Sequence, residues 1–168
     1  MTLDARGLID KHRGRGVLVD TNLLVLLLVG SVNRRRILNF KRTQSFNTGD
    51  FDVLVHLIGW FGPPLVSTPH VLSQVSDLTD LSGKEFRDAR RLFGATVETI
   101  EEIYDSSRVL ATDPLFARLG LADAAIASAC SKGILVLTSD LNLHLALEGG
   151  GFDALNFNHV RALGWRSA

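Results

Sequence analysis

The sequence predicts an α/β domain built as a three-layer α/β/α sandwich, with a mostly parallel central sheet of four to five strands. Short runs of β-favouring apolar residues alternate along the chain with longer segments of helical periodicity. Hydrophobic residues make up 46% of the chain and charged residues 21%, as in ordinary globular proteins. A length of 168 residues fits one domain, so we expect residues 1–168 to form a single unit, with 1–15 as an N-terminal extension.

Three short apolar runs are predicted as strands because each ends at polar residues that can begin a helix. They cover residues 17–19, 65–67 and 134–137. A fourth strand is predicted near residues 154–157. With their intervening helices, these runs favour parallel pairing.

The segments between the predicted strands carry helical patterns punctuated by glycine. The predicted helices cover residues 51–61, 71–78, 84–93, 103–110 and 121–131, and apolar residues after Asp20 and Asp140 predict two more. Right-handed crossovers place the carboxyl ends of parallel strands at one edge of the sheet, where ligands of such sheets bind. Polar residues that terminate strands should therefore converge.

Overall charge does not indicate a partner, because Lys plus Arg and Asp plus Glu both total 18. Cys130 is the single cysteine, which excludes a disulfide within the chain and suits a reducing, cytoplasmic location. The longest apolar run, residues 23–29, is far shorter than the roughly 20 residues of a membrane span. We therefore expect a cytoplasmic protein with no membrane partner.

Three aspartates are the candidate catalytic residues and metal ligands. Asp20 and Asp140 follow predicted strands, and Asp123 lies at the start of a predicted helix rich in small residues. Carboxylates gathered in one crevice repel one another unless protons or a cation neutralise them. Oxygen-only ligation favours Mg²⁺ or Mn²⁺ over zinc.

Four motifs, taken in order, resemble those of the PIN-domain family. They are residues 17–22 (VLVDTN), 67–75 (STPHVLSQV), 119–126 (LGLADAAI) and 137–140 (LTSD), spread over nearly the whole chain. The resemblance implies a PIN-like fold and a metal-dependent ribonuclease, of the kind found in toxin–antitoxin pairs and in RNA-processing factors. It also implies that the aspartates at positions 20, 123 and 140 bind the metal, and that RNA and an antitoxin protein are partners.

One position departs from that family pattern. Gln74 stands where PIN domains usually carry glutamate; it can coordinate through its carbonyl oxygen but brings no charge. Asp77 lies three residues further along the same predicted helix and is a candidate replacement ligand. Three polar residues are candidates for orienting the ligands or water: Asn22, Thr138 and Asn142.

Each aspartate also has a purely structural interpretation. Asp20 and Asp140 are suitable helix N-caps, and Asp123 is a suitable first-turn acid for a helix dipole. An isolated Asp after a strand favours the capping interpretation. The presence of all three favours a shared site.

A dense basic cluster is a candidate RNA-binding surface. It comprises Arg34, Arg35, Arg36, Lys41 and Arg42, in a segment predicted to be irregular. Such runs are also common in solvated loops. If the cluster grips RNA phosphates, it supplies the attraction that a neutral protein with an acidic site lacks.

The function predicted from these features is endoribonuclease activity, by in-line attack of water activated at an acidic Mg²⁺ or Mn²⁺ site. The alternative is a catalytically weakened PIN fold that serves as an RNA-binding or protein-interaction module, for which Gln74 is the evidence. The apolar helix at residues 51–61 is expected to be mainly core. Any surplus apolar surface on it is a candidate homodimer face or antitoxin groove.

Overall fold

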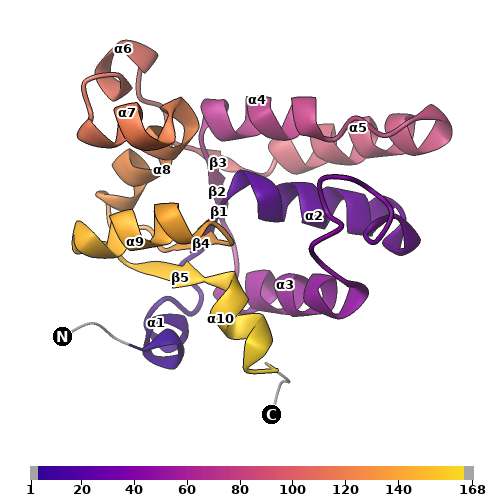
Figure 1. Cartoon of the computed structure of the whole chain (residues 1–168), viewed down its shortest axis with the longest axis horizontal. Helices are drawn as coiled ribbons and strands as arrows, with labels where there is room; N and C mark the ends of the chain where they lie inside the picture. Colours follow the sequence, from indigo (N-terminus) through magenta and orange to yellow (C-terminus); the bar gives the residue numbers. More distant parts are fainter. Residues whose placement is uncertain (1–3, 165–168) are drawn as a thin grey trace.

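A five-stranded parallel sheet forms the centre of the molecule (Figure 1), in a computed structural model that describes residues 4–164. The strand order is β3-β2-β1-β4-β5, and every adjacent pair is parallel. The strands are β1 (Val17–Val19), β2 (Leu65–Ser67), β3 (Glu101–Glu102), β4 (Val136–Thr138) and β5 (Ala154–Asn156). The predicted α/β fold class is confirmed, and the sheet is parallel throughout.

Helices cover both faces of this sheet and complete three layers. They are α1 (Ala5–Lys11), α2 (Thr21–Val32), the 3-10 turn η1 (Arg34–Arg36), α3 (Thr48–Phe61), α4 (Pro69–Leu78), α5 (Gly83–Val97), α6 (Ser107–Leu110), α7 (Pro114–Leu119), α8 (Leu121–Cys130), α9 (Leu141–Gly149) and α10 (Phe157–Ala162). From β1, the chain adds β2 and then β3 on one side of the sheet. It then crosses back and adds β4 and β5 on the other side of β1. Right-handed crossovers therefore put α2 to α5 on one face and α6 to α9 on the other, and Figure 1 shows α2, α3 and α5 across the strands from α8 and α9.

The central strand β1 forms because its three residues suit a position covered on both faces. Val17, Leu18 and Val19 are completely buried. Leu18 pairs with Val66 of β2 on one side and Val136 of β4 on the other. Each such aliphatic side chain contributes roughly 1.5–3 kcal/mol on burial, so this short strand is firmly held at the middle of the sheet.

Polar residues at the carboxyl ends of the strands begin the next helices. Asp20 caps α2, Thr68 caps α4, Asp140 caps α9 and Asn156 caps α10, each accepting a backbone N–H through its side chain. The capping interpretation of Asp20 and Asp140 is therefore correct, but it does not describe everything that these two residues do. It also places both carboxylates at the edge of the sheet where ligands bind.

Two predicted segments differ from the structure. The helix predicted over residues 103–110 is confirmed only for its second half, because helix α6 begins at Ser107 and the edge strand β3 precedes it. This strand is two exposed glutamates, which carry no apolar pattern to indicate a strand. The segment at Arg34–Arg36, predicted to be irregular, is a 3-10 turn that begins beyond Asn33.

Helix α1 packs onto the domain within the predicted N-terminal extension, of which residues 1–3 lie outside the described part. Ile9 is completely buried in the main core. The buried His12 contacts Asp153 at 2.7 Å between Nε2 and Oδ2. Most of the extension is thus integrated with the domain.

The apolar surface of α3 is mainly core, as expected. Phe51, Leu54, Leu57 and Phe61 are buried, and Val55 is the large apolar residue that this helix exposes. The helix therefore offers little surplus apolar surface for a homodimer or an antitoxin.

Among residues 4–164, no helix has the length and apolar character needed to span a bilayer.

Candidate active site

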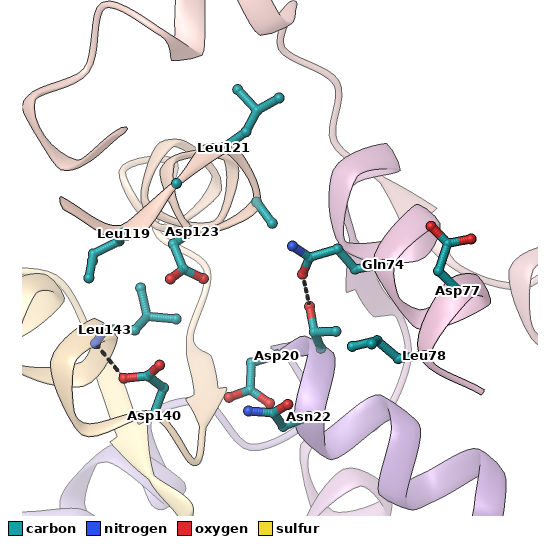
Figure 2. Close-up of a pocket in the computed structure, with 13 residues that line it drawn as sticks. Asp20, Asn22, Gln74, Asp77, Leu78, Leu119, Leu121, Asp123, Asp140 and Leu143 are labelled. Atoms are coloured by element: carbon teal, nitrogen blue, oxygen red, sulfur yellow. Dashed lines mark hydrogen bonds between the residues drawn. The ribbon is translucent and has the colours of Figure 1, made fainter. Parts of the chain in front are cut away.

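A pocket of about 400 Å³ lies where the strand order reverses, at the carboxyl ends of the neighbouring strands β1 and β4. Connections from these two strands leave in opposite directions, which opens a crevice in a parallel sheet. We call it the acidic pocket (Figure 2). Six predicted site residues line it: Asp20, Asn22, Gln74, Asp77, Asp123 and Asp140.

Asp20 forms the floor of the acidic pocket and joins β1 to β4. Its side chain is buried, with 4% of the residue exposed. One carboxylate oxygen, Oδ1, accepts the Leu23 N–H at 2.9 Å. The other, Oδ2, accepts the Thr138 hydroxyl and the Ser139 N–H, the latter at 2.8 Å. A carboxylate has about four acceptor positions, so these three bonds leave about one for a ligand.

Asp140 and Asp123 are more open to a ligand than Asp20. Asp140 uses Oδ1 to accept the N–H groups of Asn142 and Leu143 at 2.7 and 3.1 Å, while Oδ2 makes no hydrogen bond to the described residues. Asp123 accepts no hydrogen bond through its side chain from the described part of the chain. Figure 2 shows its carboxylate facing the pocket from the first turn of α8. Both aspartates therefore present free oxygens.

The start of α8 places Asp123 in the pocket. Gly120 has a φ of +90°, which a residue with a side chain rarely adopts, and this turn allows α8 to begin directly after α7. No side chain caps α8 within the described residues. Its free N–H groups and helix dipole favour negative charge at this end of the pocket.

The electrostatics of the acidic pocket oppose ionisation of its acids. Burial is the main factor that raises the pKa of Asp20, and the charge of Asp140 adds to it. For Asp123, burial and then the charges of Asp140 and Asp20 raise the pKa from 3.8 to about 6. A cation in the pocket would stabilise the ionised forms of both Asp20 and Asp123.

Gln74 faces the acidic pocket but is already hydrogen-bonded. Its carbonyl oxygen accepts the Thr21 hydroxyl at 2.9 Å. An amide oxygen has two lone pairs, so one remains for a ligand. Asp77 also lines the pocket. Figure 2 shows Gln74 directed toward the middle of the pocket and the Asp77 carboxylate at its outer edge.

The three predicted orienting residues contribute in different ways. Thr138 donates its hydroxyl to Asp20 and accepts the Asp140 N–H at 2.9 Å, so one side chain links two acids. Asn22 lines the pocket. Asn142 contributes its backbone N–H to Asp140, not its side chain, which is outside the pocket lining. The structure thus gives Asn142 a backbone contact with Asp140, and the orienting role of its side chain stays a prediction.

The donor chemistry fits a hard divalent cation. Side-chain oxygens of Asp20, Asp123 and Asp140 are available, and the pocket lining contains no histidine or cysteine among the described residues. The carboxylates share the pocket without closing into a preformed cluster: within residues 4–164, no three His, Cys, Asp or Glu side chains already stand at metal-holding positions.

Ion pairs occupy much of the predicted basic cluster. Arg34 binds Asp52 through two hydrogen bonds of 2.5 and 2.8 Å, and Arg36 binds Glu85 at 2.6 Å. These arginines are correspondingly less available to RNA. Lys41 pairs with the exposed Asp80 at 2.9 Å.

Sequence reasoning missed two contributors to the acidic pocket. Ser139 supplies a backbone N–H to Asp20, and Thr21 holds Gln74. Ser139 was detectable as the residue between a strand end and a helix cap. The Thr21 contact joins residues 53 positions apart, and no sequence signal marks it.

Comparison of the chain with family models, with curated proteins and with solved structures gives no match. The interpretation of the site therefore depends on its own geometry and chemistry.

Proposed function

We propose that this protein is a PIN-like, metal-dependent endoribonuclease that hydrolyses RNA phosphodiester bonds in the acidic pocket. One observation carries the proposal. Carboxylates from three separate segments, Asp20, Asp123 and Asp140, line one pocket at the switch point of a parallel sheet. Stability alone does not account for Asp123, because its ionised form is disfavoured there and caps nothing.

The three acids differ in what they can do. Asp20 is fixed by three hydrogen bonds and provides a rigid point of attachment. Asp140 is oriented through one oxygen and presents the other. Asp123 is the least restrained, and its pKa of about 6 without metal means that a cation would have to displace its proton in mildly acidic solution.

A bound Mg²⁺ or Mn²⁺ would be held by Asp20, Asp123 and Asp140, with the Gln74 carbonyl and Asp77 as further oxygen donors. The chemistry that such an ion supplies is stabilisation of negative charge on phosphoryl oxygens and activation of water. The protein holds the acids at the end of a buried sheet, where the partly buried pocket strengthens their electrostatic effect.

Cleavage of labelled RNA tests this function. Wild type, Asp20→Asn and Asp123→Asn are compared in Mn²⁺, in Mg²⁺ and in EDTA, on structured and single-stranded RNA. We expect cutting by wild type with either metal, none in EDTA, and a loss of at least about a hundredfold in each variant. Protons compete with the metal for these carboxylates, so at metal concentrations below saturation the activity should fall as the pH drops below about 6. Folded wild type that cuts no RNA with either metal would contradict the proposal.

A second candidate is a PIN-like module that binds RNA or protein without cutting. The hydrogen bond from Thr21 to Gln74 favours it, because the expected acidic ligand is replaced by a neutral group with a structural partner. The variant Gln74→Glu separates the two. It should raise cleavage by a ribonuclease that binds metal weakly, whereas a binding module should remain inactive.

A further inference from the structure

A second pocket adjoins the acidic pocket and has the opposite charge. Its volume is about 440 Å³, and we call it the basic pocket. The residues that matter to its chemistry are Lys41, Arg42, Arg161, Asn22, Ser139 and Asn158. Asn22 lines both pockets, and Ser139 lies between two residues of the acidic site, so the pockets share a wall.

Three cations line the basic pocket, and its described lining includes no carboxylate, although Lys41 pairs with Asp80 outside the lining. Two hydrogen bonds fix the Arg161 side chain: its guanidinium nitrogen Nη1 donates to Asp50 at 3.0 Å and to the Ser45 carbonyl at 3.2 Å. Its other nitrogens remain for a ligand. Arg42 is exposed and makes no ion pair with the described residues.

Neutral donors complete the lining. Asn158 donates its side-chain N–H to the Ser139 carbonyl at 2.9 Å, which fixes the wall shared with the acidic pocket. Asn22 and Ser139 are themselves capable of donating hydrogen bonds to an anion. Positive charge together with several polar donors suits a phosphate group.

We propose that the basic pocket binds a phosphate of the RNA strand adjacent to the phosphate that lies in the acidic pocket. This inference rests on the proposed function, because it positions the same RNA. A protein with equal numbers of acidic and basic residues has no overall field to hold a polyanion, so a local cation site is required. The basic pocket provides that attraction beside the acids through Arg42, which makes no ion pair with the described residues, and through the remaining donors of Arg161.

The test is binding of a fluorescent single-stranded RNA of about ten nucleotides, followed by anisotropy over a series of KCl concentrations in EDTA. Every protein carries Asp123→Asn, so that the strand stays intact. Arg42→Gln is compared with Arg6→Gln, a matched change at an exposed arginine of α1 outside both pockets.

We expect Arg42→Gln to weaken binding roughly five- to tenfold and to reduce the salt slope by about 0.7, the value for one phosphate contact on a single strand. Arg6→Gln should stay within about twofold of its parent. Equal effects of the two variants, or no RNA binding by the parent, would overturn the inference. A third result would also overturn it: inorganic phosphate competes with the RNA, but Arg42→Gln binds RNA as tightly as its parent does. The basic pocket would then be a site for free phosphate and not for the RNA strand.

These outcomes are separable from those of the proposed function. An effect of Arg42→Gln on binding, with no cleavage by wild type, would support the phosphate site and contradict hydrolysis. Cleavage by wild type with no difference in RNA binding between Arg42→Gln and Arg6→Gln would support hydrolysis and contradict the phosphate site.

Discussion

Replacing Asp123 with asparagine should stabilise the metal-free protein at neutral pH. Burial and the charges of Asp140 and Asp20 disfavour the ionised carboxylate in the folded state, raising its pKa from 3.8 to about 6. Asparagine has nearly the same shape and no charge. Removing a catalytic candidate is therefore expected to increase stability.

The pH dependence has a definite sign. Because the folded state binds the Asp123 proton more tightly than the unfolded chain, wild type is favoured at low pH and loses stability as pH rises from about 4 to about 6. A shift of about two pKa units corresponds to at most about 3 kcal/mol. Since Asp123 is partly exposed, solvent screening reduces this to roughly 1–2 kcal/mol.

Thermal and urea unfolding of wild type and Asp123→Asn in EDTA, between pH 4 and 8, measure the effect. The two proteins should have similar stability near pH 4, and above pH 6 the variant should melt roughly 2–8 °C higher. Asp77→Asn, an exposed acid of the same pocket, is the control and should change stability by less than about 0.5 kcal/mol. A variant that is less stable than wild type at pH 8 would refute the reasoning.

Two further changes test the packing and hydrogen bonds that support the pocket. Thr138→Val removes the hydroxyl that donates to the buried Asp20, and urea titration should show a free energy of unfolding lower by about 1–3 kcal/mol. Thr138→Ser keeps the hydroxyl and should lower the free energy of unfolding by less. Equal losses in the two variants would contradict a role for the hydroxyl. Gly30→Ala places a Cβ against the ring of Phe51, where there is no room for it, and should lower stability by about 1–3 kcal/mol. At Gly59, also in a helix, an added Cβ has no atom nearby, so Gly59→Ala should raise stability by about 0.5–1 kcal/mol. Similar effects of these two alanine variants would contradict the packing described for Gly30.

The sequence was most informative at the strand ends. The prediction of strand 65–67 is confirmed without change, and the strand predicted at 134–137 is observed at Val136–Thr138. Convergence of Asp20 and Asp140 followed from parallel pairing, because both residues terminate buried apolar runs. Periodicity and caps are local properties, so the sequence displays them directly.

Features that depend on distant contacts were less accessible. Strand β3 consists of Glu101 and Glu102, whose pairing with β2 depends on backbone hydrogen bonds at an edge and not on side-chain pattern. The ion pairs of Arg34 and Arg36 join residues 18 and 49 positions apart. Arg161 was not recognised as a partner of Lys41 and Arg42, because the fold alone brings the last helix beside them.

Binding of Mn²⁺, followed by the loss of the free-ion electron paramagnetic resonance signal, tests most directly whether the three carboxylates share one divalent cation. Wild type is compared with Asp123→Asn and with Asp77→Asn, which changes the donor at the outer edge of the pocket (Figure 2), at pH 7.5, and all three proteins are shown to be folded. We predict that wild type binds Mn²⁺, that Asp123→Asn weakens binding by at least about tenfold, and that Asp77→Asn has a smaller effect. Mn²⁺ affinity that is unchanged in Asp123→Asn, or undetectable in folded wild type, would contradict a metal site at the end of this sheet.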